Sequence, residues 1–232
     1  VEEQGAEWGS AVVIEVGTGR VLALSDTHTF DPANPNDGGS VGSRAVQAPV
    51  EPGSSGKLMT FAAAIDQGQV DPLSLFETTS TRTMPNGETI RDNEPHPAEN
   101  LTVAGTLAKS YNTGLIQIGD TVSDEVRYEY MQSFGIGERT GIELPAESSG
   151  IFADYTTWGP RSRYTTMFGQ AYALTTVQLA QMVATIANGG VRTDLHIVDS
   201  ITHPDGTVEP TIVEEPIRVI EEETADQMLG LM

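Results

Sequence analysis

The first part of the chain holds two short runs of strand-forming residues. The ranges 8–16 and 20–25 are rich in β-branched and apolar residues, and Gly17-Thr18-Gly19 joins them. Two such runs around a glycine-containing turn are typical of a β-hairpin. We therefore predict an N-terminal hairpin, followed over 26–52 by a long loop rich in Pro, Gly, Asn and Ser.

The middle of the chain has the hydrophobic spacing of helices. Between Lys57 and Gly68, apolar residues recur at helical spacing, and nearly all residues between them are also apolar: Leu58, Phe61, Ala62 and Ile65. This pattern predicts a helix that is buried on almost every side. Shorter helices are expected over 103–108, 113–121 and 127–134.

Turn and cap signals divide the rest of the chain. An irregular connection is expected over 135–163, and Thr175 can cap a helix that Asn188-Gly189-Gly190 closes. Turn residues at 85–87 and 203–206 predict two further hairpins, the second between 195–202 and 207–213.

The order of these elements predicts an α+β domain, because strands come first and helices fill the middle. Helical spacing continues to the last residue without a capping signal: Ala225, Met228, Leu229 and Met232. Val1 opens without a Met or a signal-like stretch. We therefore expect a piece of a longer protein that stops inside an element, with an incomplete sheet.

Composition narrows the possible functions. The 232 residues, 38% of them hydrophobic, can form one substantial core. A formal charge of −21 with only 12 Lys and Arg argues against nucleic acid as a partner, and most of the acidic residues are expected on a solvated face. Cysteine is absent, which excludes disulfides and thiolate chemistry. The sequence has no run of about 18 apolar residues.

The first candidate for chemistry is Pro52-Gly53-Ser54-Ser55-Gly56-Lys57, at the start of the buried helix. Ser54 and Lys57 are three residues apart, so on a helix their side chains share one face. Serine becomes a nucleophile when a base takes its proton, and lysine can be that base if burial lowers its pKa. The alternative is that Ser54 only caps the helix.

The second candidate is Ser110-Tyr111-Asn112, between two predicted helices and directly after Lys109. In a tight turn, residues two apart can present a hydroxyl for proton relay and an amide for a substrate carbonyl. Taken alone, the segment is better explained as a capping turn, because Ser and Asn favour such positions.

Together, the two segments match the S-x-x-K and S-x-N motifs of penicillin-binding proteins and related β-lactamases. The chain resembles class B, division-type penicillin-binding transpeptidases over essentially its whole length. Further segments in matching order are Ala23-Leu24-Ser25, Thr29-Phe30-Asp31-Pro32, Arg44-Ala45-Val46, Glu51-Pro52-Gly53, Leu107-Ala108-Lys109, Thr140-Gly141-Ile142, Phe168-Gly169-Gln170 and Ala184-Thr185-Ile186-Ala187-Asn188-Gly189-Gly190.

The resemblance implies a peptidoglycan D,D-transpeptidase that cross-links stem peptides through a serine acyl-enzyme in septal cell-wall synthesis and that β-lactams inhibit covalently. Ser54 would be acylated by a D-Ala-D-Ala stem peptide, Lys57 would be its base, and Ser110 would relay protons to the leaving D-alanine. Asn112 would hold the donor peptide. Neither a metal nor a cofactor is implied.

The resemblance also implies the penicillin-binding and serine β-lactamase-like fold, an antiparallel sheet flanked by helices. The family's third motif, Lys-Thr/Ser-Gly, is absent from residues 1–232. We expect the chain to be a transpeptidase domain that ends before this motif and its C-terminal strands. Gly56 stands where many relatives carry a larger residue and is expected to soften the first helical turn. An extracytoplasmic location, an N-terminal membrane anchor and a division glycan polymerase as partner are implied as well.

Other functions remain open from the residues alone. A serine β-lactamase would need a glutamate to activate water, and Glu143 and Glu147 lack the surrounding pattern. A D,D-carboxypeptidase would pass the acyl group to water, and a non-catalytic sensor or scaffold would bind β-lactams without turnover. A histidine-based hydrolase is disfavoured, since four scattered histidines lie in polar segments and are expected to be exposed, without metal-ligand spacing: His28, His96, His196 and His203.

Overall fold

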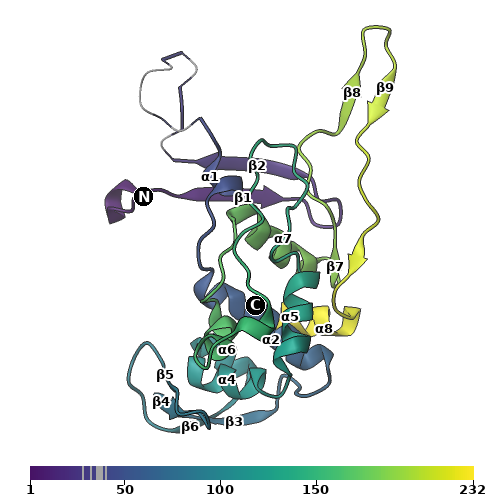
Figure 1. Ribbon diagram of the computed structural model, residues 1–232. Coiled ribbons are helices and arrows are strands. Elements are labelled where there is room, and N and C mark those ends of the chain that lie inside the picture. Colours follow the sequence, from purple (N-terminus) through teal and green to yellow (C-terminus); the bar gives the residue numbers. More distant parts are fainter. Residues whose placement is uncertain (28, 32, 35–38, 40) are drawn as a thin grey trace.

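The computed structural model describes residues 1–232 apart from 28, 32, 35–38 and 40. Helix α2 (Lys57–Asp66) lies at the centre of the larger hydrophobic core, and α4 (Asn112–Gly119), α5 (Asp124–Ser133) and α8 (Glu222–Leu231) pack against it (Figure 1). Eight of the ten residues of α2 are buried. The prediction of a helix buried on almost every side is confirmed.

The N-terminal hairpin is also confirmed. Strands β1 (Ser10–Ile14) and β2 (Val21–Asp26) pair antiparallel. Helix α7 (Thr176–Ala187) and the short α1 (Arg44–Gln47) pack against β1 around a second, smaller hydrophobic cluster. Thr175 caps α7 as expected, because its Oγ1 accepts a hydrogen bond from the N–H of Gln178 (3.3 Å), whose side chain accepts one from the N–H of Thr175 (2.8 Å).

Both later hairpins form at the predicted turns. Strands β4 (Thr81–Thr83) and β5 (Thr89–Arg91) flank residues 85–87. Strands β8 (Ser200–Thr202) and β9 (Val208–Pro210) are shorter than predicted, fully exposed, and project away from the body (Figure 1). Leu195 is not part of this hairpin, because its side chain is buried in the smaller cluster.

The sequence analysis missed two strand pairs and misplaced one helix start. Strand β3 (Leu75–Thr78) pairs with β6 (Glu99–Thr102), and β7 (Val191–Arg192) pairs with β10 (Ile217–Arg218). These short strands are more than 20 residues apart in sequence, so no local turn signal marks the pairing. Helix α5 begins three residues before the predicted start because Ser123 caps it, with its Oγ accepting from the N–H of Val126 (3.2 Å).

The α+β prediction and the antiparallel pairing are confirmed. Within the described residues, each sheet consists of two strands. The described helices include none that is both long and apolar enough to cross a membrane. The remaining elements are α3 (Val103–Lys109), α6 (Ser162–Thr165), and the 3₁₀ helices η1 (Glu2–Gln4), η2 (Gly53–Gly56), η3 (Tyr155–Thr157) and η4 (Thr166–Phe168).

Candidate active site

Ser54 lies in η2, which runs directly into α2. Its side chain is exposed, and its Oγ accepts a hydrogen bond from the Oγ of Ser110 at 2.9 Å. No side chain caps the start of η2 or α2. The alternative that Ser54 serves only as a helix cap is therefore wrong.

Lys57 is the first residue of α2 and is 1% exposed. Its Nζ donates to the backbone oxygen of Ser110 at 2.5 Å and to the Oγ of Ser110 at 3.0 Å. The structure thus brings Ser54, Lys57 and Ser110 together, and the hydroxyl of Ser110 joins the other two. The donors run from Lys57 through Ser110 to Ser54. Once Lys57 is uncharged, both hydroxyls can rotate and reverse this direction, and a proton can then pass from Ser54 to Lys57.

Burial lowers the pKa of Lys57 from 10.5 to about 8, and the negative charge of Asp92 opposes this shift. At pH 7, roughly a tenth of the molecules then carry an uncharged Lys57, compared with fewer than one in a thousand at an ordinary lysine pKa. Only the uncharged amine can accept a proton. Burial within the core therefore makes Lys57 chemically suited to act as a base.

Ser110 ends helix α3 in the left-handed conformation, with φ 54° and ψ 34°. This conformation is uncommon for a residue other than glycine. Here it turns the backbone oxygen and the hydroxyl of Ser110 toward Lys57. The segment is therefore a helix-ending turn, as its residue types suggested, and also the link between Ser54 and Lys57.

Asn112 is the first residue of α4, and its side-chain amide donates to the backbone oxygen of Arg91 at 3.0 Å. A cavity of about 470 Å³ with a mainly polar lining adjoins it, formed by Thr89, Ile90, Arg91, Asn93, Asn112, Arg161, Phe168 and Gln170. The place of Asn112 on this cavity wall is compatible with the predicted contact to a peptide.

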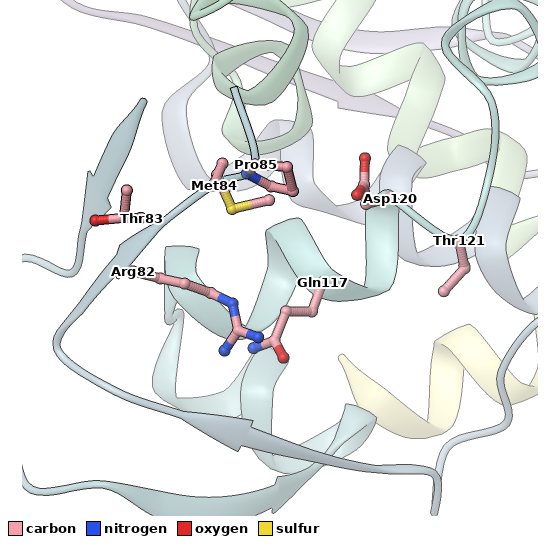
Figure 2. A pocket seen from close by; sticks show the side chains of 7 residues that line it. All are labelled: Arg82, Thr83, Met84, Pro85, Gln117, Asp120 and Thr121. Atoms are coloured by element: carbon pink, nitrogen blue, oxygen red, sulfur yellow. The ribbon is translucent and has the colours of Figure 1, made fainter. Parts of the chain in front are cut away.

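A second cavity of about 470 Å³ lies between the β4–β5 hairpin and the C-terminal end of α4 (Figure 2). It is lined by Arg82, Thr83, Met84, Pro85, Gln117, Asp120 and Thr121, and it includes none of the four predicted site residues. We assign no chemistry to this cavity.

The sequence analysis overlooked Asp92. Its carboxylate accepts hydrogen bonds from the N–H groups of Asn112 (2.5 Å) and Thr113 (3.0 Å) and from the Thr113 hydroxyl (2.8 Å). Asp92 therefore caps α4 from 20 residues away in sequence. The one available signal was indirect, since Tyr111 directly precedes α4 and offers no side-chain cap.

A second feature that the sequence analysis missed is the strand-like contact that supports Ser54. Residues 169–174 run antiparallel to 50–53, with hydrogen bonds between the backbones of Val50 and Leu174 in both directions (2.8 and 2.9 Å) and from Gly53 N to Gly169 O (3.0 Å). Gly169 has φ +83°, and a Cβ there would lie 1.9 Å from the oxygen of Gly53. This contact fixes the backbone directly before the nucleophile.

Packing explains why residue 56 is a glycine, which the sequence alone did not reveal. It is buried in helical conformation, and an added Cβ would lie 2.2 Å from the Oη of Tyr172 and 3.0 Å from the Cα of Gly169. Tyr172 is 2% exposed, so its ring cannot swing away. Gly56→Ala gains about 1 kcal/mol of helix propensity, whereas overpacking costs about 1–3 kcal/mol. We expect a net loss of stability, measured by urea unfolding.

Tyr172→Phe offers the matched control for this prediction. The Oη of Tyr172 is buried without a hydrogen-bond partner among the described residues, so removing it costs little. It also removes the atom nearest to the new methyl group. Gly56→Ala should therefore be less destabilising in the Tyr172→Phe background, and equal losses in both backgrounds would contradict the packing explanation.

The expectation that the histidines are exposed is wrong for two of them. The side chains of His96 and His196 are 9% and 11% exposed, because they pack between elements that the sequence does not place side by side. His203 in the β8–β9 hairpin is 43% exposed, as expected, and His28 and Pro32 lie outside the described residues. Among the residues that the structure covers, no group of three or more His, Cys, Asp or Glu could hold a metal ion.

Comparison with known proteins places this geometry in context. Residues 9–232 match the family model described as "Penicillin binding protein transpeptidase domain". The chain is 39% identical over 229 residues to penicillin-binding protein PbpB of Mycolicibacterium smegmatis, covering 97% of this chain and 35% of that protein. It is 32% identical over 196 residues to the peptidoglycan D,D-transpeptidase FtsI of Escherichia coli, covering 83% of this chain and 32% of FtsI.

The fold has a close counterpart in a solved structure. Penicillin binding protein 3 from Mycobacterium tuberculosis, complexed with aztreonam, superposes with a TM-score of 0.94 at 32% identity, covering 98% of this chain and 51% of that one. The chain thus spans about a third of the length of the curated relatives named above and about half of this crystallised relative.

Proposed function

Because the chain belongs to the penicillin-binding protein transpeptidase family, of the class B type, we propose that it carries the acyl-transfer site of a peptidoglycan D,D-transpeptidase. The observation that carries the proposal is the hydrogen-bonded path from Ser54 through Ser110 to a buried Lys57 with a lowered pKa. These groups supply a nucleophile, a relay and a base in contact with one another.

In the proposed reaction, the Oγ of Ser54 attacks the carbonyl carbon of the penultimate D-alanine of a donor stem peptide. The proton of Ser54 passes to Ser110, and a proton of Ser110 passes to uncharged Lys57. The peptide bond then breaks, and the amine of the leaving D-alanine takes a proton back along the same path. An ester on Ser54 results. The amine of a second stem peptide attacks its carbonyl carbon, the bond to the Oγ of Ser54 breaks, and a proton of that amine passes through Ser110 to the Oγ, which leaves the cross-link amide and free Ser54.

As Ser54 attacks, negative charge develops on the carbonyl oxygen of the substrate, and hydrogen-bond donors are needed to stabilise it. The backbone N–H of Ser54 makes no hydrogen bond to another described residue and is available at the start of η2. Asn112, on the wall of the adjoining cavity, is proposed to hold the donor peptide. The sequence Lys-Thr/Ser-Gly does not occur in residues 1–232, and its contribution to the site remains a prediction.

The wider setting is proposed from the relatives. We propose an extracytoplasmic domain, anchored to the cell membrane by a further N-terminal segment, that acts in septal cell-wall synthesis. Its expected ligands are stem peptides and β-lactams, and a division glycan polymerase is its expected protein partner.

A β-lactamase activity has less support. The two glutamates considered for water activation are engaged elsewhere, since Glu147 accepts from the N–H and hydroxyl of Thr140 (2.7 and 2.6 Å) and Glu143 accepts from the N–H of Ile197 (2.8 Å). Neither contacts Ser54. We therefore expect the penicilloyl ester on Ser54 to persist, because neither glutamate is placed to activate water against it.

The full-length protein tests this function. Incubation with a peptide ending in D-Ala-D-Ala should release D-alanine, and an added amine acceptor should yield an amide product at the expense of hydrolysis. Hydrolysis alone would indicate a carboxypeptidase. Release of hydrolysed penicillin within seconds would indicate a β-lactamase, and stable acylation without any peptide turnover would indicate a sensor.

A further inference from the structure

His96 has an acceptor at each ring nitrogen. Its Nδ1 lies 2.8 Å from the backbone oxygen of Pro97, and its Nε2 lies 3.0 Å from the Oδ2 of Asp92. A carbonyl oxygen and a carboxylate can only accept hydrogen bonds. A neutral imidazole has one N–H and would leave its second nitrogen facing an acceptor. When Asp92 is a carboxylate, both nitrogens face acceptors and both are satisfied only if each carries a proton, which makes His96 an imidazolium.

The partners of Asp92 are those that suit a carboxylate. Its two oxygens face the N–H groups of Asn112 and Thr113, the Thr113 hydroxyl and the Nε2 of His96, four groups that can all donate. The side chain of Asp92 is 1% exposed. A histidine and an aspartate thus form a buried ion pair directly behind the 110–112 loop.

Other charged and titratable groups face this pair from neighbouring elements. From β6, Glu99 Oε1 lies 3.9 Å from the Nδ1 of His96, and it also pairs with Lys109 of α3 (2.8 Å). The ring of Tyr111 stacks on His96, with centroids 4.0 Å apart and planes inclined by 7°. The net surroundings of His96 are acidic, which stabilises its positive charge.

Both members of the ion pair contact the 110–112 loop. Asp92 holds the N–H of Asn112, and His96 holds the ring of Tyr111, so the pair fixes the residues that follow Ser110. We propose that His96 is a positioning residue of the acylation site, which as an imidazolium paired with Asp92 holds the 110–112 loop. The consequence for catalysis rests on the proposed function.

The signs of the pKa effects agree with this role. The hydrogen bond to Asp92 raises the pKa of His96 above its ordinary value, while burial opposes the shift. Asp92 raises the pKa of Lys57, against the larger effect of burial. Removal of the positive charge of His96 leaves Asp92 uncompensated, so the pKa of Lys57 should rise. Since acylation needs uncharged Lys57, the acid limb of its pH profile should move to higher pH.

The first test measures the protonation state directly and needs no activity. The full-length protein is labelled with ¹⁵N-histidine, and His96 is assigned by the loss of its signals in His96→Gln. We expect both ring nitrogens of His96 to be protonated at pH 7 and the imidazolium to lose its proton at a higher pH than an ordinary histidine. The spectrum of a neutral tautomer at pH 7 would overturn the proposal.

The second test is the rate of penicillin acylation against pH. His96→Gln keeps a donor for Asp92 but removes the charge, and we expect the acid limb to shift upward by roughly 0.5–1 pH unit, a three- to tenfold loss at pH 7. Asp92→Asn should shift the limb downward, because the charge that raises the pKa of Lys57 is gone. His203→Gln, in the exposed β8–β9 hairpin, is the matched control and should leave the profile unchanged.

The outcomes distinguish the positioning role of His96 from the proposed transpeptidase function. An unchanged acid limb in His96→Gln, with wild-type acylation intact, would overturn the positioning role while the proposed function stands. Absence of acylation in the wild-type protein would remove the proposed function, and the NMR titration would still decide whether His96 is an imidazolium. A thermal unfolding curve of each variant identifies any loss of rate that comes from loss of the fold.

Discussion

Ser54→Ala is expected to abolish covalent labelling of the full-length protein by a fluorescent penicillin, with a loss of at least about 10³-fold in acylation rate. The Oγ of Ser54 is the atom that forms the ester, and it is the hydroxyl that Ser110 connects to the amine of Lys57. Alanine removes that atom without disturbing a buried contact, since Ser54 is exposed. Gel fluorescence and peptide mapping of the labelled protein provide the measurement.

Ser55→Ala is the matched control for this prediction. Ser55 is the next residue of η2 and equally exposed, but no hydrogen bond connects its side chain to Lys57 or Ser110 among the described residues. Its substitution should leave labelling within about twofold of wild type. Label on any other serine, or undiminished label in Ser54→Ala, would contradict the assignment of Ser54 as the nucleophile.

Lys57→Arg is expected to reduce acylation by roughly 10²–10⁴-fold, the usual contribution of a general base. A guanidinium keeps its proton at all accessible pH values and cannot receive one from Ser110. In the wild-type protein, acylation should fall about tenfold for each unit of pH below the pKa of Lys57, which is about 8. Stopped-flow measurement of the acylation rate from pH 5.5 to 9.5, roughly two units on either side of that pKa, measures both the loss in Lys57→Arg and the pH dependence of the wild-type protein.

The chain offers one matched control for this substitution, because its only other lysine is Lys109. The ammonium group of Lys109 is exposed and pairs with Glu99 at 2.8 Å, a contact that arginine can keep. Lys109→Arg should therefore acylate at the wild-type rate. If Lys57→Arg also acylated within a few-fold of wild type, Lys57 would be an electrostatic support and not a base.

The buried Lys57 also carries a cost in stability. Its pKa is lower in the folded protein than in the unfolded chain, so between about pH 8 and 10.5 the unfolded state binds more protons and stability rises with pH. Below about pH 8, burial of charged Lys57 lowers the free energy of unfolding by roughly 3 kcal/mol, the value that corresponds to a pKa shift of this size. The same burial that makes the amine a base thus weakens the fold at neutral pH.

The sequence by itself determined the features that depend on neighbours along the chain. The apolar run after Lys57 predicts a helix buried on most sides, and the three-residue spacing predicts that Ser54 lies one turn before Lys57, as it does in η2. Thr175 and Gln178 cap α7 through contacts within one turn. Such local contacts cost little chain entropy to form, so the residue types alone predict them.

The tertiary structure decided the contacts between distant segments. Ser110 meets Lys57 across 53 residues, Asp92 caps α4 across 20, and Tyr172 fits against Gly56 only because 169–174 lies beside 50–53. His96 was expected at the surface, and its ring is instead stacked against Tyr111 from the start of α4. No local pattern encodes these pairs, because they exist only after the packing of whole helices has brought their residues together.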